Sequence, residues 1–172
     1  MPKFKLLMIP QKYDDWFKSL GFREISFGYG GLSLCLPAEI EANQVGYSRS
    51  PEGESLCDGS SGSWKTNWVV IGNDTLTGDP LILDTGNSNF PVMTDMPGEG
   101  VWNPRLIATS LDAFAFALKT IQKVSVGRAD PVQLEENPLS KEELDQSLQA
   151  IRSKNSGEID MEFWSLILES DL

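Results

Sequence analysis

Histidine is absent from this sequence, and its absence excludes several kinds of active site. Without an imidazole the chain can form neither a Ser–His nor a Cys–His nucleophile pair, and it lacks the usual general base near neutral pH. Histidine-ligated zinc is excluded too, and the two cysteines would need two carboxylates to complete a structural zinc site. Catalysis would have to use carboxylates, a Ser–Lys pair or a tyrosine. The composition therefore favours a protein that is not an enzyme and needs neither metal nor cofactor.

Cysteine and long apolar runs are also scarce. Cys35 lies in an alternating apolar segment and Cys57 in a Ser/Gly-rich loop, so nothing in the sequence requires them to pair. No apolar run approaches the roughly 20 residues of a membrane span, and the first apolar stretch is too short for a secretory signal. We therefore expect a cytoplasmic protein with reduced cysteines that does not enter membranes.

Positive charge is in short supply as well. The chain has 14 Lys and Arg against 25 Asp and Glu, a net charge of −11. This balance disfavours nucleic acids and anionic membranes as partners, because phosphate binding needs a basic surface. It suits a basic protein partner, whose encounter with the chain long-range attraction would accelerate. Solubility alone is the plainer explanation of the same charge.

What the chain does contain is enough apolar material for one packed domain. Its 172 residues are 40% hydrophobic and include five Trp and eight Phe. Apolar periodicity predicts an early helix over 10–20, a short helix over 38–45 and a long helix over 109–123. Strands are expected over 23–27, 32–36, 67–72, 79–84 and 90–95, and residues 48–66 have the composition of a mobile loop. Sequential short strands usually pair antiparallel, so we expect a meander.

Capping residues mark the helix ends. Gly21 follows the first helix, as glycine often follows a helix C-terminus. Thr109 and Asp112 have the spacing of a capping box at the start of the long helix, and Ser140 and Glu143 have it further on. The latter pair opens a helix over 139–153, and a last helix is expected over 158–170.

The composition divides the chain near residue 127. Residues 1–127 carry 14 acidic and 10 basic side chains, whereas residues 128–172 carry 11 acidic and 4 basic ones. We interpret the first part as an α+β domain and the second as an acidic helical C-terminal extension. Because this pair of helices is too short to bury its apolar faces by itself, it must dock on the first part or on a partner.

The segment "LILDTGNS" at residues 81–88 has the form in which an aspartic protease presents its catalytic carboxylate. Such enzymes need two carboxylates about 3 Å apart that share one proton. The chain has a single Asp-Thr-Gly, so a protease would be a homodimer with one Asp84 from each copy. The hydrophobic–glycine element that braces the active loop of such homodimers has no good counterpart here. The simpler interpretation is that Asp84 ends a strand and Thr85 and Gly86 begin a turn.

Two further motifs fail on spacing. "SKNSGEIDMEFW" has the rhythm of a calcium-binding EF-hand, but aligning Gly157 puts Arg152 and Lys154 at carboxylate positions and Phe163 where a glutamate is required. Gly157 more simply separates two helices. The glycines of "FGYGGLS" at 27–33 are wrongly spaced for a dinucleotide fingerprint and lead into a strand instead of a helix.

The central motifs resemble, in their order, the SUKH superfamily, which includes fungal cell-wall-synthesis regulators and many bacterial immunity proteins. They are Trp68, "VIG", Asp74, "TGDPLILD", "FPV", a Trp-containing turn and "IATSLDAFAFAL". The opening "IPQKYDDWFKSLG" and the later "GYGGLSL" are similar to that family's first helix and first strand. The likeness covers about residues 8–124, and the loop at 48–66 and the tail beyond 127 depart from it.

This resemblance implies a SUKH-like α+β fold, in which helices flank a curved antiparallel sheet, and it implies no catalytic residues. It implies a non-enzymatic protein-binding domain, in bacteria most often an immunity protein that neutralises a cognate toxin, commonly a nuclease. A regulatory scaffold of the cell-wall-signalling type is the alternative, and the homodimeric protease using Asp84 is a remote one. The partner would be a protein, and a basic toxin domain suits the charge.

The resemblance also suggests roles for single residues. Sheet core is expected at Trp68, Ile71 and Leu83, turns at Gly72, Gly78 and Gly86, and Asp79 would pin the loop between two strands. Asp74, Asp95 and Glu99, near strand ends, are our candidates for a partner-facing acidic rim. Trp102 is a candidate surface anchor, although core packing is the favoured interpretation. The competing acidic surface is on the tail: Glu135, Glu136, Glu142, Glu143 and Asp145.

Overall fold

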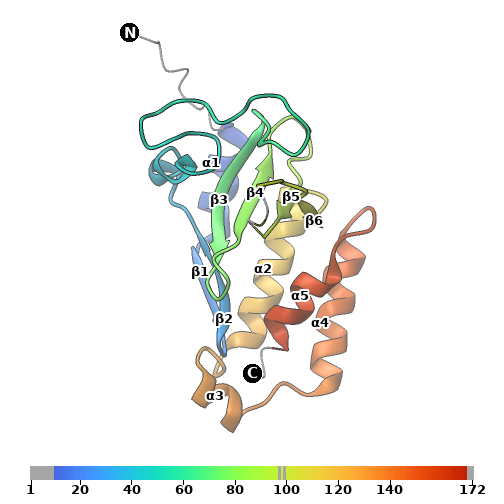
Figure 1. Ribbon diagram of the computed structural model, residues 1–172. Coiled ribbons are helices and arrows are strands. Elements are labelled where there is room, and N and C mark those ends of the chain that lie inside the picture. Colours follow the sequence, from blue (N-terminus) through green and yellow to red (C-terminus); the bar gives the residue numbers. More distant parts are fainter. Residues whose placement is uncertain (1–9, 97, 99, 170–172) are drawn as a thin grey trace.

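The computed structural model describes residues 10–169 except 97 and 99. Within these residues the sheet has six antiparallel strands in sequence order, curled into a half-barrel (Figure 1). The strands are β1 (Glu24–Phe27), β2 (Gly30–Leu34), β3 (Trp68–Asp74), β4 (Pro80–Asp84), β5 (Val92–Thr94) and β6 (Arg105–Ala108). The predicted α+β class and meander are confirmed. The sequence did not reveal β6, a strand of four residues that leads almost directly into a helix.

The helices of the described residues are α1 (Gln11–Leu20), α2 (Leu111–Ser125), α3 (Pro131–Glu136), α4 (Lys141–Lys154) and α5 (Met161–Leu168). The helix expected over 38–45 is instead two 3₁₀ turns, η1 (Pro37–Glu39) and η2 (Ala42–Gln44). The side-chain amides of Asn43 and Gln44 bond to the carbonyls of Glu39 and Ile40 at 2.8 Å each. Side-chain bonds of this kind compete with those of a regular helix.

The helix caps agree with the sequence in two of three cases. Gly21 ends α1 with a φ of 82°, a left-handed conformation that glycine adopts without strain. Ser140 and Glu143 form the predicted capping box of α4. The prediction for α2 was wrong: Ser110 is the cap, and its side chain accepts a hydrogen bond from Ala113 N. Thr109 instead donates its main-chain N–H to Asn155 Oδ1 at 2.8 Å.

The sheet has a different hydrophobic cluster on each face because its strands alternate. Val69 and Ile71 of β3 point to the inner face, where the α-helices form the main core. Trp68 and Val70 point to the outer face, where a smaller cluster forms. Of the residues expected in the sheet core, Trp68, Ile71 and Leu83 are all buried, Trp68 on the outer face.

The C-terminal helices belong to the main core. Buried side chains from α3, α4 and α5 join it: Leu134, Ile151, Phe163, Trp164, Ile167 and Leu168. Trp164 donates its indole N–H to the carbonyl of Ile107 in β6 at 2.9 Å, and Asp160 N bonds to Leu106 O at 2.7 Å. Figure 1 shows α4 and α5 beside α2, so the tail docks on the body of the protein.

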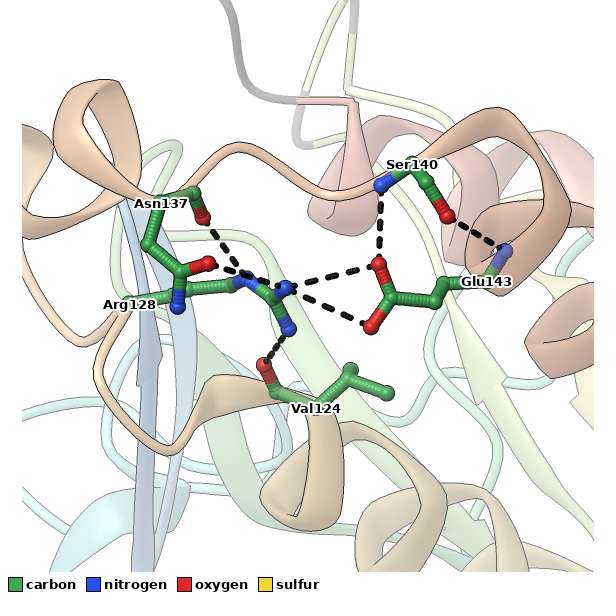
Figure 2. A network of polar contacts seen from close by, with 5 residues as sticks. All are labelled: Val124, Arg128, Asn137, Ser140 and Glu143. Atoms are coloured by element: carbon green, nitrogen blue, oxygen red, sulfur yellow. Dashed lines mark hydrogen bonds and ion pairs between the residues drawn. The ribbon is translucent and has the colours of Figure 1, made fainter.

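Arg128 joins the ends of three helices (Figure 2). Its guanidinium donates to Val124 O at the end of α2 (3.0 Å) and to Asn137 O after α3 (2.7 Å). It also lies 3.3 Å from Glu143 in the first turn of α4. Hydrogen bonds from Ser140, and secondarily the charge of Arg128, hold the pKa of Glu143 below its usual value. Arg128 therefore fixes the segment that connects the body to the tail.

Gly72 was expected in a turn but lies within β3. A Cβ atom there would stand 2.2 Å from Ser33 O of the neighbouring strand β2, so only glycine lets these strands pair. The β3–β4 register shifts between Val70 and Gly72, a bulge that adds to the curl of the sheet. Gly78 and Gly86 do lie in turns, as expected.

None of the described helices has the length and apolarity needed to cross a membrane.

Candidate functional site

The outer face of the sheet is covered by loops. Its buried residues are Trp64, Trp68, Val70 and Ile82, and Tyr47, Cys57, Met93 and Trp102 pack partly buried against them. We call these eight residues the outer cluster. Tyr47, Cys57 and Trp64 come from the segment between η2 and β3, and Trp102 comes from the segment between β5 and β6. The first of these segments is the long teal loop at the top of Figure 1.

Residues 48–66 form a loop, as their composition predicted, but this loop also contributes side chains to the outer cluster. Trp64 is only 2% exposed and donates its indole N–H to Trp68 O at 3.0 Å. Trp102 N bonds to Gly62 O at 2.7 Å, which ties the two outer loops together. A lone tryptophan in "SSGSWKT" was the signal in the sequence, since an aromatic ring in a Ser/Gly-rich loop needs a packing partner.

Gln44 attaches the start of this loop to the sheet. Its side chain is fully buried, accepts a hydrogen bond from Val70 N (3.0 Å) and donates to Val70 O (2.9 Å). The amide group thus acts as a strand partner where β2 no longer pairs with β3. Such a two-way bond satisfies main-chain groups that would otherwise be buried without partners.

Three aromatic rings of the outer cluster line an open pocket. The Tyr47, Trp64 and Trp102 ring centroids lie 4.9–5.8 Å apart. The pocket, of about 250 Å³, is completed by loop residues: Gly46, Leu56, Asp58, Ser60, Ser61, Gly62, Ser63 and Gly100. Ser60 donates to Asp58 Oδ1 from its main-chain nitrogen (2.8 Å) and its hydroxyl (2.6 Å). These bonds hold the pKa of Asp58 below its ordinary value.

Asp95 and Trp102, two of the predicted partner-facing residues, lie close together. Asp95 Oδ2 accepts a hydrogen bond of 2.6 Å from Asn103 N, the residue after Trp102. Trp102 itself is half-buried against the outer cluster and also lines the pocket. Trp102 thus packs against the core, as the favoured interpretation predicted, and leaves part of its side chain accessible at the pocket. The predicted rim residue Glu99 lies outside the described residues.

Asp74 is at the same end of the sheet as Asp95 but acts within its own turn. The pairing of β3 with β4 and of β4 with β5 places the ends of β3 and β5 together. The carboxylate of Asp74 accepts hydrogen bonds from Leu76 N (2.7 Å) and Thr77 N (3.1 Å). Asp74 therefore pins the β3–β4 turn, the role expected of Asp79. Asp79 lies close enough to Tyr47 to add to the rise in its pKa, which burial mainly causes.

Asp84 ends β4, as the simpler interpretation predicted. Its Oδ1 accepts hydrogen bonds from the Asn67 side chain and from Gly86 N. Thr85 N bonds to Asn67 O at 2.8 Å, so the Asp-Thr-Gly residues fasten the turn after β4 to the start of β3.

The acidic residues of the tail lie elsewhere. Glu135 and Glu136 are exposed on α3, Glu142 and Asp145 are exposed on α4, and Glu143 is part of the Arg128 network. The structure therefore brings Asp95 and Trp102 together on the outer face and leaves the tail acids on the helical side of the molecule.

The two cysteines lie on opposite faces of the sheet, both as free thiols. Cys35 is in the main core and Cys57 packs against the outer cluster. Among the described residues no three acidic, cysteine or histidine side chains are grouped so that they would hold a metal ion.

Comparisons of this chain with protein-family models, with curated proteins and with solved structures found no significant match.

Proposed function

We propose that this protein is a non-enzymatic binding domain, and that it serves as a bacterial immunity protein against a cognate toxin domain, commonly a nuclease. The resemblance of its central motifs to the SUKH superfamily supports the immunity role. The observation that carries the binding role is the outer face, where exposed apolar and acidic groups surround a cluster of aromatic rings.

Apolar side chains are exposed beside the outer cluster. Four of them come from the two outer loops: Val45 (47% exposed), Leu56 (42%), Met96 (66%) and Val101 (59%). A scattered exposed apolar residue needs no explanation, but several around one aromatic cluster are typical of a protein-binding surface. Interfaces of this kind draw most of their affinity from a few aromatic anchors with polar groups around them.

The charge of this face suits a basic partner. Asp58, Asp79 and Asp95 lie in the loops and turns around the outer cluster. The cations of the same loops are engaged, since Arg49 bonds to Glu41 at 2.6 Å and Lys65 lies 5.1 Å from the centroid of the Trp68 ring. With a net charge of −11 for the whole chain, a basic domain would be attracted over long range.

A rescue experiment tests this function. The chain would be co-expressed with the toxic C-terminal domain encoded by the neighbouring gene, and cell survival and co-purification would be scored. Survival together with a stable complex is the expected result, and the complex should weaken as salt is raised. Cell death in the presence of folded protein, with weak binding to several endogenous proteins, would instead support the regulatory scaffold.

A further inference from the structure

Of the aromatic side chains in the part of the chain that the structure describes, only Tyr29 is exposed; the others are buried or partly buried. Tyr29 lies in the two-residue turn between β1 and β2, where Phe27 pairs with Gly30. Gly28, the first residue of the turn, has a φ of 55°, which is typical of a type II′ hairpin turn. Gly28 N also bonds to Arg128 O at 2.8 Å. The turn is therefore tight and fastened to the connection between α2 and α3, and it holds Tyr29 in a defined place at the surface.

Exposed aliphatic side chains accompany Tyr29. The bond between Gly28 and Arg128 brings the α2–α3 connection beside the β1–β2 turn. Thr75 N bonds to Gly31 O at 3.0 Å, which brings the β3–β4 turn beside the start of β2. In Figure 1, α3 and the β1–β2 turn are at the bottom, whereas the long loop of the outer face is at the top. Four exposed apolar residues come from these turns and from α3, and we call them the hairpin patch: Tyr29 (54% exposed), Leu76 (51%), Val126 (77%) and Val132 (63%).

The charge around the hairpin patch is negative. Glu135 and Glu136 follow Val132 by three and four residues on α3, the spacing of neighbours on one helix face, and both are exposed. Arg128, the cation of this segment, is already bound to the ends of three helices. The other charged side chains of these turns and of the end of α2 are three carboxylates and one ammonium: Asp74, Asp79, Asp130 and Lys123. The apolar patch therefore has a rim in which carboxylates outnumber cations.

We propose that the hairpin patch binds a protein segment whose apolar side chains are flanked by lysine and arginine, and that it binds this segment independently of the outer face. The apolar groups of the segment cover the exposed side chains, and its cations pair with the carboxylates of α3 and lie on the ring of Tyr29. A tyrosine held by a tight turn loses little conformational freedom on binding, which suits an anchor residue. A second copy of this chain fits worse, because two hairpin patches would bring like charges together. The proposal goes beyond the proposed function, since it gives the protein a second partner-binding surface.

The test uses the whole protein and a short synthetic peptide with leucines at helical spacing and lysine or arginine at the other positions. Such a peptide presents an apolar face flanked by cations. The main-chain amide signals are followed by NMR during a titration, and we expect saturable shifts at Tyr29, Val126 and Val132. A control peptide with serine in place of each leucine keeps the charge and should bind at least tenfold more weakly.

Variants at exposed positions show whether the ring and the rim act as proposed. Tyr29→Ser should weaken binding of the leucine peptide at least tenfold, whereas Leu166→Ser, at a 62% exposed position on α5, should leave it unchanged. Glu136→Gln should weaken it about twofold to fivefold, the range of an exposed ion pair. Glu142→Gln removes the same charge from an exposed position on α4 and should have no effect.

Four results would overturn the proposal. They are the absence of saturable shifts at the hairpin patch, shifts confined to the outer face, equal binding of the two peptides, and equal losses in Tyr29→Ser and Leu166→Ser. Sedimentation velocity adds a fifth: a dimer that Tyr29→Ser abolishes would show that a second copy covers the patch. These measurements do not involve the toxin, so their failure is distinct from a failure of the rescue experiment.

Discussion

Arg128 should contribute more to stability than any surface ion pair of this protein. The residue is 9% exposed, and its side chain donates to the main-chain carbonyls of Val124 and Asn137 as well as to Glu143. Arg128→Met keeps a stem that can pack in the same place but removes every donor. The two carbonyls at the ends of α2 and α3 then lose their charged partner.

The expected loss is about 2–3 kcal/mol. A hydrogen bond from a charged group contributes about 1.5–3 kcal/mol, and relief of the desolvation of the guanidinium offsets part of the loss of two such bonds. For a chain of this size, such a loss lowers the melting temperature by about 4–12 °C. Arg128→Lys should recover little of it, because one ammonium cannot bond to three helix ends at once.

Urea unfolding followed by circular dichroism measures this loss, and Glu143→Gln is the matched control. Gln can still accept the hydrogen bond from Ser140 N, so Glu143→Gln should cost less than Arg128→Met. Because the pKa of Glu143 is lowered in the folded protein, its contribution is present above the ordinary pKa of glutamate and is lost as pH falls through the lowered value. That acid-side loss should shrink in Glu143→Gln. An Arg128→Met or Arg128→Lys protein as stable as the wild type would refute the reasoning.

Three further predictions concern the sheet and its two faces. Gln44→Leu should cost about 2–4 kcal/mol in urea unfolding, since it leaves both main-chain groups of Val70 buried without their partner; a neutral substitution would show that Gln44 is not a strand partner. Gly72→Ala should cost about 1–3 kcal/mol by crowding β2, and an unchanged melting temperature would contradict this. Alkylation followed by mass spectrometry should label Cys57 before Cys35, because burial raises the pKa of the Cys35 thiol to about 11. Equal labelling rates in the native protein would contradict the burial of Cys35 in the main core.

The elements with strong local signals could be predicted from the sequence. The short apolar runs "NWVVIG" and "DPLILD", separated by a turn-rich segment, predicted β3 and β4 as antiparallel neighbours, and the spacing of Ser140 and Glu143 predicted the start of α4. β6 and α3 were not found: β6 leads almost directly into α2, so no turn separates it from the helix, and the six residues of α3 are too few to show a period. The cap of α2 was misplaced by one residue because Thr109, unlike Ser110, has an acidic residue three positions later; in the structure Asn155 bonds to Thr109 and Ser110 caps the helix.

The candidate site was only partly predictable. Asp95 and Trp102 are near each other in the chain, and the loop that holds both brings Asp95 to the main-chain nitrogen of Asn103, the residue after Trp102. Tyr47, Asp58 and Trp64 were missed as site residues, because the lone tryptophan in "SSGSWKT" indicates that the loop packs against something but not that it folds back over the sheet. Such contacts depend on packing between distant segments, and periodicity says nothing about them.

The central claim is that the outer face binds a basic protein partner, and a matched pair of variants tests it most directly. Met96→Lys places a cation among the exposed apolar residues of the outer face, whereas Leu166→Lys places one on α5 at nearly equal exposure (66% and 62%). Calorimetric titration with the partner identified by rescue should show binding weakened at least tenfold by Met96→Lys and unchanged by Leu166→Lys. Unchanged binding by Met96→Lys, with a loss in Leu166→Lys, would contradict the account and place the interface on the C-terminal helices.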